Sequence, residues 1–327
     1  MTGEQDQQQE YYSTLDAHHV APLWGVLHKM VPPRPNPSSQ VQTWPYASIR
    51  PLLMQAGDLI SAEEAERRVL MLVNNPTLGP PYTTDTIYAG LQLILPGETA
   101  PAHRHTAFAL RFIVEGDSDG AFTAVQGKKV VMERGDVILT PSWTWHDHGS
   151  DSKGPMVWLD GLDLPVYRFL PINFAENHSD PRYPSELAEG ELAKGLKFPW
   201  KDMQTQLDAN ASTTGHVKLD YRHADGSHLS KTISAQAERV NAGTSSSKVR
   251  ETLSFVYHVY EGQGYTTIVT PEGEEKVVMW MRKDTFNVPA WSVVSHTCRS
   301  QSDSAYLFAI TDRPMIEALG LYRKEEL

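Results

Sequence analysis

The sequence has a single cysteine, Cys298, in 327 residues. An intrachain disulfide is therefore excluded, and this fits a reducing compartment. No apolar run approaches the roughly 18 residues that a membrane-spanning helix needs, and no secretory signal pattern stands at the start. We therefore expect a cytoplasmic protein with no membrane partner.

Basic residues are also fewer than acidic ones. The chain has 29 Lys and Arg against 40 Asp and Glu, which gives a formal net charge of −11. This balance argues against general binding to nucleic acid or to anionic membranes. The length suffices for two domains of ordinary size. The polar, Gln-rich start, Met1 to Gln9, predicts disorder.

What the chain does have is a group of histidines at strand spacing. Residues two apart on a β-strand point to the same face, so His103 and His105 can direct two imidazoles at one point. A second antiparallel strand can bring His146 to that point. Three neutral imidazoles hold a metal and leave positions open, as a catalytic site requires. We predict that His103, His105 and His146 are metal ligands.

The spacing around these histidines is more specific than the histidines themselves. The first block reads Gly97-x5-His103-x-His105, and the second reads Gly135-x5-Pro141, with His146 five residues on. A lone His-x-His also occurs as two ordinary core or surface histidines. Both blocks in order, with Gly and Pro at turn positions, favour a metal site. They resemble the two signature blocks of the cupin superfamily, a double-stranded β-barrel with a metal in its mouth.

The rest of the chain has two kinds of pattern. Residues 15–75 have helical and irregular character, and a capping box from Ser61 to Glu64 predicts a helix over 62–72. From Thr86 onward, short alternating runs separated by Gly, Asp and Pro predict an all-β barrel.

An internal repeat predicts a second barrel. Glu115-Gly116 and Pro141-Ser142-Trp143 are echoed by Glu261-Gly262 and Pro289-Ala290-Trp291. The alignment replaces all three histidines: Val249 stands for His103, Glu251 for His105 and Val294 for His146. The second barrel is therefore predicted to be metal-free, and its remaining His258 and His296 to be structural.

These patterns together predict an all-β protein with a helical N-terminal arm, a bicupin of two jelly-roll β-barrels in tandem. The expected parts are a helical arm at 1–80, a metal-binding cupin at 81–175, a linker at 176–215 with a short helix around 185–197, and a metal-free cupin at 216–327.

Several polar residues are expected near the metal. If the strand from His103 runs unbroken, Arg111 points into the same cavity, where it must meet an anion. That anion is either a structural carboxylate or a substrate carboxylate held by the guanidinium fork. His148 follows His146 by two residues and is expected beside the metal as a hydrogen-bonding residue rather than as a fourth ligand.

Three more positions are candidates for the same cavity. Gln92 faces opposite to the leucines that flank it, while Trp158 and Asp160 share one face of a later strand. Positions 109 and 110, where cupins often carry a Glu ligand, are Ala and Leu, so the common two-His-one-carboxylate iron site is absent. A three-His site keeps the full metal charge and favours an anionic, chelating substrate, but spacing alone leaves iron, zinc, manganese and nickel open.

At this point a closer resemblance is visible. The chain resembles the gentisate 1,2-dioxygenase family, which includes salicylate and 1-hydroxy-2-naphthoate dioxygenases. The resemblance rests on six stretches: Ala65-Glu66-Arg67-Arg68-Val69-Leu70, Ala100-Pro101-Ala102-His103-Arg104-His105-Thr106, Ala109 to Gly116, Thr140 to Gly149, Trp158 to Asp163, and Thr311-Asp312-Arg313-Pro314.

The resemblance implies an Fe(II)-dependent, extradiol-type ring-cleaving dioxygenase with iron in the first barrel only. The substrates would be a small aromatic hydroxy acid and O2; gentisate would become maleylpyruvate by cleavage between the carboxylate-bearing carbon and the adjacent hydroxyl-bearing carbon. It also implies a homotetramer whose N-terminal arm helps assembly. By position it assigns the following roles: His103, His105 and His146 bind iron; Arg111, Gln92, Trp158 and Arg67 bind substrate; His148 and Asp160 act in catalysis.

One departure and three alternatives stay open. Ala107-Phe108 stands where many bacterial members have a polar pair, which bears on the substrate rather than on the chemistry. Salicylate or 1-hydroxy-2-naphthoate is an alternative substrate. A metal-binding cupin without oxygen chemistry, such as a hydrolase, an isomerase or a storage protein, is an alternative function. So is a non-catalytic aromatic-acid binding module, although an open metal site would then have no purpose.

Overall fold

The computed structural model describes residues 2–74, 78–116, 120–211 and 215–327. The chain forms two compact units, Met1–Asn36 and Pro37–Leu327. In the described residues no helix is long and apolar enough to cross a membrane.

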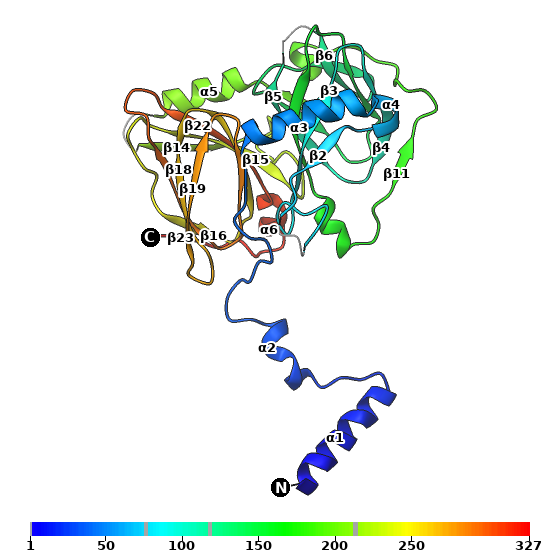
Figure 1. Ribbon diagram of the computed structural model, residues 1–327, viewed down its shortest axis with the longest axis vertical. Helices are drawn as coiled ribbons and strands as arrows, with labels where there is room; N and C mark the ends of the chain where they lie inside the picture. The colour runs from blue at the N-terminus through cyan, green and yellow to red at the C-terminus, as the bar shows by residue number, and fades with distance from the viewer. Residues whose placement is uncertain (1, 75–77, 117–119, 212–214) are drawn as a thin grey trace. The chain divides into compact units, whose positions relative to one another are not determined.

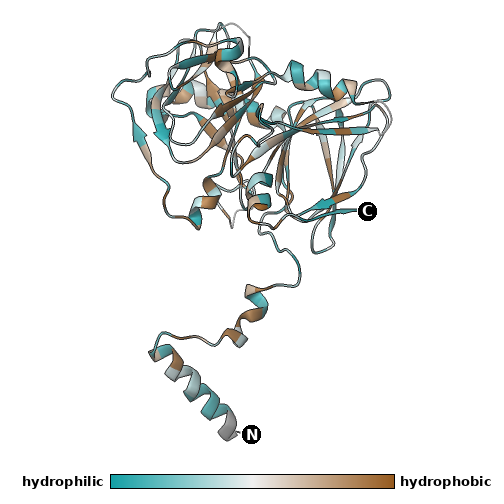
Figure 2. Cartoon of the chain, turned by 180° about the vertical axis from the view of Figure 1, so that it is seen from behind, coloured by the Kyte–Doolittle hydropathy of each residue, from teal (hydrophilic) through white to brown (hydrophobic). Residues whose placement is uncertain are grey.

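The first unit is helical. It contains α1 (Thr2–Ala17), the 3-10 helix η1 (Leu23–Gly25) and α2 (Leu27–Met30). We expected disorder over Met1–Gln9, but residues 2–9 belong to α1, because Gln and Glu have good helix propensity. Met1 lies outside the described residues. The hydropathy colouring of Figure 2 shows α1 as mainly hydrophilic.

The second unit contains the two predicted barrels (Figure 1). One sheet of the first barrel has the strand order β13-β8-β5-β10-β3-β2, and the other has the order β11-β4-β9-β6-β7-β12. The strand bounds in the first sheet are β2 Val69–Met71, β3 Tyr88–Ile94, β5 Ala109–Glu115, β8 Val137–Thr140, β10 Met156–Leu162 and β13 Lys197–Phe198. In the second sheet they are β4 Thr99–His105, β6 Ala121–Val125, β7 Lys128–Val131, β9 His146–Ser150, β11 Ala175–Asn177 and β12 Glu186–Leu187.

The second barrel repeats this plan. Its sheets have the orders β1-β20-β17-β22-β15-β14 and β19-β18-β21-β16-β23. The first contains β1 Thr43–Trp44, β14 His216–Asp220, β15 Ser234–Val240, β17 Phe255–Glu261, β20 Thr285–Val288 and β22 Ala305–Thr311. The second contains β16 Val249–Glu251, β18 Gln263–Val269, β19 Glu275–Met281, β21 Val293–Cys298 and β23 Lys324–Glu326. The prediction of a tandem bicupin is confirmed.

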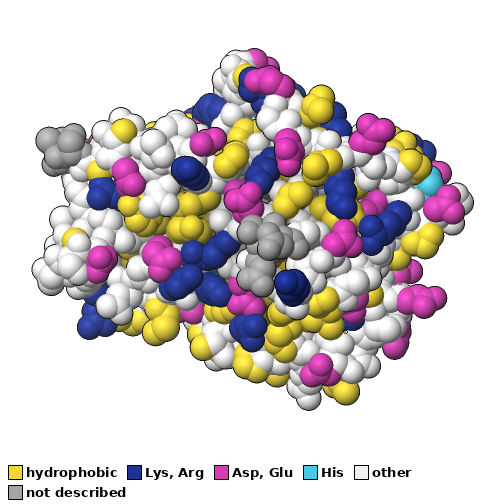
Figure 3. All heavy atoms as spheres, turned by 90° about the horizontal axis from the view of Figure 1, so that it is seen from above, with side chains coloured by type: hydrophobic (Ala, Val, Ile, Leu, Met, Phe, Trp, Pro, Cys, Tyr) yellow, Lys and Arg dark blue, Asp and Glu magenta, His cyan; other side chains and the backbone are white. Residues whose placement is uncertain are grey.

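Short helices connect these strands. They are α3 (Tyr46–Leu59), α4 (Ala62–Ala65), η2 (Leu164–Arg168), η3 (Gly190–Ala193), α5 (Trp200–Ala209) and α6 (Arg313–Ala318). Figure 3 shows one face of the molecule, on which basic and acidic side chains are interspersed with apolar ones.

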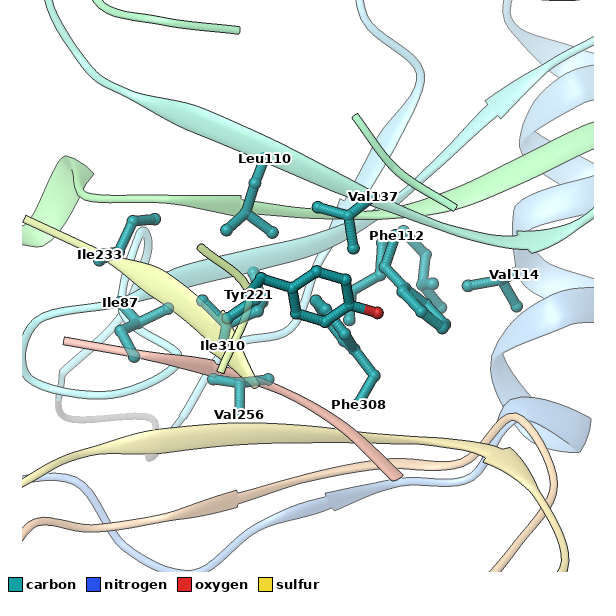
Figure 4. Packing of buried hydrophobic residues seen from close by; sticks show 14 of the residues in the cluster. Ile87, Leu110, Phe112, Val114, Val137, Tyr221, Ile233, Val256, Phe308 and Ile310 are labelled. Carbon is teal, nitrogen blue, oxygen red and sulfur yellow. The ribbon is translucent and has the colours of Figure 1, made fainter. Parts of the chain in front are cut away.

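The hydrophobic core joins the two barrels. Phe112 of β5 stacks on Phe308 of β22, with ring centroids 4.1 Å apart, and Leu110 and Ile310 belong to the same cluster (Figure 4). All four side chains are fully buried. Burial of each large apolar side chain contributes about 1.5–3 kcal/mol, so the contact between the two inner sheets is a substantial part of the stability.

A short strand from the stretch that precedes each barrel in the sequence pairs with a sheet of the other barrel. β1 pairs with β20 of the second barrel, and β13 pairs with β8 of the first. The first N–H of α3, on Tyr46, donates to Asp284 at 2.9 Å, and the first N–H of α5, on Trp200, donates to Asp136 at 3.2 Å. Trp44-Pro45-Tyr46 and Phe198-Pro199-Trp200 are therefore equivalent, and the repeat extends into the parts expected as an arm and a linker.

The helix expected over 62–72 is shorter than predicted. The cap is present, since Ser61 Oγ accepts from the Glu64 N–H at 3.0 Å, but α4 ends at Ala65. Glu66 has a φ of 50° and turns the chain away from the helix. The apolar residues that follow form β2, which pairs with β3, because pairing at a sheet edge overrides a helical preference. Similarly, the short helix expected near 185–197 is replaced by β12 and η3.

Candidate active site

The three predicted ligands meet inside the first barrel. β4 and β9 run antiparallel, with His103 directly opposite His146. The His103 and His146 rings lie 4.2 Å apart between centroids, and the His105 and His146 rings lie 4.9 Å apart. One ligand nitrogen from each ring lies within 4.8 Å of the other two, as a shared metal ion requires.

Hydrogen bonds orient two of the imidazoles as ligands. His105 Nδ1 lies 2.8 Å from the Ala107 carbonyl, and His146 Nδ1 lies 2.9 Å from the Thr144 carbonyl. A ring that donates Nδ1–H to a carbonyl keeps its Nε2 lone pair for a metal. In the described part of the chain, the buried His146 Nε2 has no hydrogen-bond partner. These residues therefore fit a bound metal.

Burial keeps these histidines neutral. Burial, with the nearby Arg67 guanidinium adding to it, lowers the pKa of His103 to about 2. Burial lowers the pKa of His105 to about 4 and that of His146 well below its ordinary value. The neutral form is the one that binds metal, so ligation needs no proton release from these rings near pH 7.

Arg67 reaches the histidines from the turn after α4. Its guanidinium donates to the Pro101 carbonyl at 2.6 Å and contacts the His103 ring, with Nδ1 as the nearer nitrogen and Nε2 at 3.1 Å. Burial, with the charge of Arg111 adding to it, lowers the pKa of Arg67 to about 10. The neighbouring Arg68 instead forms an ion pair with Glu98 at 2.7 Å. Of the two arginines, Arg67 is the one placed at the site.

Arg111 approaches the site from the opposite sheet. The condition that we set for Arg111, an unbroken strand from His103, is not met, because β4 ends at His105 and the chain turns before β5 begins at Ala109. The charge of Arg111 nevertheless contributes to the lowered pKa of His103, His105 and His146, so it lies near all three.

The structure gives Arg111 a carboxylate partner. Arg111 Nε lies 3.2 Å from Asp160 Oδ1, and the guanidinium also donates to Thr140 Oγ1. Trp158 Nε1 donates to the same Asp160 oxygen at 3.0 Å. Burial raises the pKa of Asp160 to about 6, against the opposing effect of Arg111. Of the two anions considered for Arg111, the structural acid is thus present in the chain.

His148 lies beside the metal group without belonging to it. Its Nδ1 is 2.9 Å from Thr123 Oγ1, and its ring centroid is 5.8 Å from that of His146. The only candidate metal group found among the described residues consists of the three other histidines. The buried Nε2 of His148 has no hydrogen-bond partner within the described ranges, so that atom is available to a ligand.

The face of β3 that carries Gln92 also carries residues that the sequence reasoning missed. Gln92 is buried opposite Trp158, and Gly90 lies opposite Asp160. A Cβ on Gly90 would come within 2.8 Å of the Tyr88 hydroxyl. Burial, with the Asp160 charge adding to it, raises the pKa of Tyr88. The two-residue alternation that singled out Gln92 points equally to Tyr88 and Gly90.

Ala107 does not share a strand face with the ligands. It is fully buried in the turn between β4 and β5, and its carbonyl is the group that orients His105. The next residue, Phe108, donates its N–H to Asp163 at 3.0 Å. This departure from the family pattern therefore acts on the turn that supports a ligand.

Taken together, the site can hold a metal on three imidazoles beside two guanidinium groups. The chain matches the family model described as the Cupin domain over residues 90–162. It is 38% identical to gentisate 1,2 dioxygenase 1 from Aquipseudomonas alcaligenes, over 97% of this chain and 96% of the relative. It is 34% identical to 5-aminosalicylate 1,2-dioxygenase from Comamonas sp., over 96% of this chain and 91% of the relative.

A solved structure extends the similarity to the whole fold. Salicylate 1,2-dioxygenase from Pseudoaminobacter salicylatoxidans, in adducts with gentisate, superposes with a TM-score of 0.86. The two sequences are 29% identical, and the match covers 98% of this chain and 94% of that one. Both barrels are thus included in these similarities. The chain belongs to the gentisate 1,2-dioxygenase family of ring-cleaving dioxygenases.

Proposed function

We propose that the protein is an Fe(II)-dependent gentisate 1,2-dioxygenase, which converts gentisate and O2 to maleylpyruvate by extradiol-type cleavage. The ring would open between the carboxylate-bearing carbon and the adjacent hydroxyl-bearing carbon. The observation that carries this proposal is the meeting of three neutral histidines with Arg67 and Arg111 in one buried site. The relative named gentisate 1,2 dioxygenase 1 supports the choice of substrate.

The iron would be held by His103, His105 and His146. When bound there, Fe(II) supplies the one-electron chemistry that the reaction of O2 with an aromatic ring requires. The donor set suits this role, because three neutral ligands leave positions open for an anionic, chelating substrate.

The two arginines differ in what they offer a substrate carboxylate. Arg111 is already paired with Asp160, whereas the hydrogen bonds of Arg67 go to neutral groups, including the Glu66 and Pro101 carbonyls. Arg67 therefore carries the less compensated charge, and Arg111 keeps an orienting position on the other side. A guanidinium on each side would fix the aromatic acid in one orientation.

His148 and Asp160 are placed to handle hydrogen bonds and protons. His148 Nε2 is buried without a partner among the described residues, and we assign it a hydrogen bond to the reacting dioxygen. Asp160, with its pKa raised to about 6, is placed to accept a hydrogen bond or a proton from a distal ring hydroxyl. Gln92 and Trp158 line the same wall and would contact the ring.

The test is O2 consumption by the Fe(II)-reconstituted protein with gentisate, followed with the near-UV absorbance of the ring-opened product. Uptake with product formation is expected. When different divalent metals are loaded, the activity should follow the content of bound iron. No uptake with any aromatic acid, despite bound iron, would favour a cupin without oxygen chemistry.

A second substrate is favoured by one observation. The relative from Comamonas sp. is named for 5-aminosalicylate, which differs from gentisate in the group at ring position 5. Ala107-Phe108, at the turn that supports His105, is the departure that bears on this choice. Parallel measurements of kcat/KM for gentisate, 5-aminosalicylate, salicylate and 1-hydroxy-2-naphthoate establish the order of substrate preference.

We also propose that the chain assembles as a homo-oligomer, with four copies expected. The first unit exposes apolar side chains that a partner would cover: Leu23, Trp24, Val26, Leu27, Met30 and Val31. Light scattering on the full chain measures the assembly.

A further inference from the structure

The outer face of the first barrel carries an arginine between two tryptophans of the neighbouring segment, directly behind the metal position. Side chains alternate along β4, so Arg104 points away from the interior that His103 and His105 face. Its guanidinium lies 4.4 Å from the ring centroid of Trp143 and 4.5 Å from that of Trp145. Both distances are within the range of a cation–π interaction. One cation therefore contacts both tryptophans of the segment that enters β9.

The contact between Arg104 and Trp145 joins the neighbours of all three candidate ligands. Arg104 stands between His103 and His105 in the sequence, and Trp145 precedes His146. His103 is paired with His146 across the antiparallel strands β4 and β9. Extending that register by one residue places Arg104 opposite Trp145, which agrees with their contact. A shift of one strand against the other would therefore break this contact and move the ligands apart together.

The chain beyond the first barrel returns to cover this contact. Arg104 Nε donates to Glu176 of β11 at 2.9 Å. The His178 N–H donates to the Ala102 carbonyl at 2.9 Å, one residue before the first ligand. The His178 ring also lies edge-on to Trp145, with 5.0 Å between the ring centroids. The outer face behind the ligands is thus held by an ion pair, a backbone hydrogen bond and ring contacts.

The second barrel repeats half of this arrangement. Arg250 stands between the two replaced ligand positions of β16, and its guanidinium lies 4.8 Å from the ring centroid of Trp291. Its Nε donates to Glu325 of β23 at 3.1 Å, as Arg104 donates to β11. Trp291 corresponds to Trp143, since the two have φ values of 63° and 60°, which are rare for bulky residues. The arginine, one tryptophan and the glutamate therefore belong to the fold.

The second indole distinguishes the barrel with the three histidines. Arg250 lies opposite Val293, so a valine stands at the position of Trp145. The barrel that has lost the ligands has thus also lost the contact across the two ligand strands, although it keeps the contacts that the fold shares. Residues that hold metal ligands in place from outside typically change metal affinity 10- to 100-fold when they are replaced.

We propose that Arg104 and Trp145 are positioning residues for the metal site. Their cation–π contact fixes β4 against β9 and so keeps the three imidazoles at the separation that one ion requires. Neither side chain is a ligand, because both lie on the outer face of the sheet. The proposal rests on the metal site of the proposed function and is independent of the substrate.

The experiment measures the Zn²⁺ affinity of the full-length protein by equilibrium competition with a chelator. Zn²⁺ binds imidazole nitrogen and has no redox chemistry, so the readout is separate from turnover. Trp145→Val, which gives the first barrel the residue of the second, should weaken Zn²⁺ binding about 10- to 100-fold, and so should Arg104→Met. Trp145→Phe keeps an aromatic face for the guanidinium and should retain most of the affinity.

Arg250→Met is the matched control, because it removes the shared half of the arrangement from the second barrel. Both arginine variants should lower Tm, and only Arg104→Met should weaken Zn²⁺ binding. Equal weakening in Arg250→Met would mean that the effect passes through the whole fold, and it would overturn the proposal.

Wild-type affinity in Trp145→Val would also overturn the proposal. If Arg104→Met does not fold, the comparison of Trp145→Val with Trp145→Phe decides, and equal affinity in these two variants counts against the positioning role. A wild type that binds Zn²⁺ but consumes no O2 when loaded with iron would contradict the proposed function, while the same variants would still decide the role of Arg104 and Trp145.

Discussion

The two barrels share one strand arrangement but carry different side chains at the position of His105. In the first barrel, His105 is neutral and its lone pair faces a metal position. In the second, Glu251 stands there and is held by Arg313 at 2.8 Å, Tyr322 at 2.7 Å and Lys218 at 3.2 Å. The second barrel therefore satisfies this position with cations from its own chain. A metal site in this fold depends on three side chains rather than on the barrel.

What the barrels share is the set of contacts that brace them together. Asp163 accepts from the Phe108 N–H at 3.0 Å and from Thr232 Oγ1 at 2.6 Å. Asp312 accepts in the same way from the Ser254 N–H at 3.0 Å and from Thr86 Oγ1 at 2.7 Å. Thr232 lies just before β15 of the second barrel, and Thr86 lies just before β3 of the first. The brace is thus reciprocal, because each barrel supplies an aspartate that binds the other.

The largest effect that separates the barrels is expected from their histidines. His146→Ala removes a ligand, so we expect loss of bound metal and a fall in kcat/KM of more than about 100-fold, which exceeds the effect of losing a residue that only supports a ligand. His296→Ala removes a buried histidine of the second barrel, the counterpart of His148, and as the control it should keep both. Metal analysis of the two purified variants, with O2 uptake, makes the measurement. Metal retained by His146→Ala would contradict the assignment.

A smaller effect is expected from the arginines. Arg67→Met should raise KM for the aromatic acid roughly 10- to 100-fold, because a hydrogen-bonded charge is worth about 1.5–3 kcal/mol. Arg111→Met should also raise KM, and it should lower the free energy of unfolding by about 3–5 kcal/mol, because Asp160 would be left buried without its cation.

The second barrel provides the control for these variants. Tyr257 occupies the position of Arg111 on the equivalent strand, and Tyr257→Phe should leave KM unchanged. Steady-state kinetics with thermal unfolding of all three variants separates binding from stability. An unchanged KM in Arg67→Met would remove that residue from the substrate site.

The sequence predicts the parts of this comparison that follow from strand periodicity. The two-residue alternation predicts that His103 and His105 point the same way, and the repeat predicts Val249, Glu251 and Val294 at the ligand positions. Arg111 was reached by the wrong route, because the turn after His105 depends on contacts with the opposite sheet that no local pattern encodes.

The exchanged leading segments could not be predicted for a similar reason. Their only sequence signal is an aromatic-Pro-aromatic triplet, Trp44-Pro45-Tyr46 and Phe198-Pro199-Trp200, and three residues are too few to establish a repeat. Their function as helix starts depends on Asp284 and Asp136, which lie far away in the sequence. The roles of Tyr88 and Gly90 were within reach, because they share the β3 face of Gln92.

The braces predict a moderate, pH-dependent effect on stability. Burial raises the pKa of Asp312 to about 6, above the ordinary value for an aspartate. The folded state therefore holds the proton more tightly than the unfolded state, and the stabilisation is lost as pH rises from about 4 to about 6. In Asp312→Asn this loss is absent, so the stability of the variant relative to the wild type should improve by on the order of 2 kcal/mol across that range.

Chemical denaturation of both proteins at a series of pH values measures the difference. Asp163→Asn, on the other side of the brace, should show the same direction, because burial also raises the pKa of Asp163. A difference that stays constant with pH would contradict the account of the brace as a buried, protonatable group.

The smallest effect tests whether the shared Thr-His pair has different roles in the two barrels. Thr123→Val removes the hydroxyl that holds His148 Nδ1, so the ring loses its fixed orientation beside the metal group, and kcat should fall several-fold, corresponding to about 1 kcal/mol. Thr266→Val makes the same change beside His296 and also removes the acceptor of the Trp280 Nε1–H. It should lower stability by about 1 kcal/mol or more and leave kcat unchanged. Because valine has nearly the volume of threonine, neither change opens a cavity. Equal effects on kcat would mean that the hydroxyl acts through the fold rather than through His148, and the distinction between the barrels would then rest on the metal ligands alone.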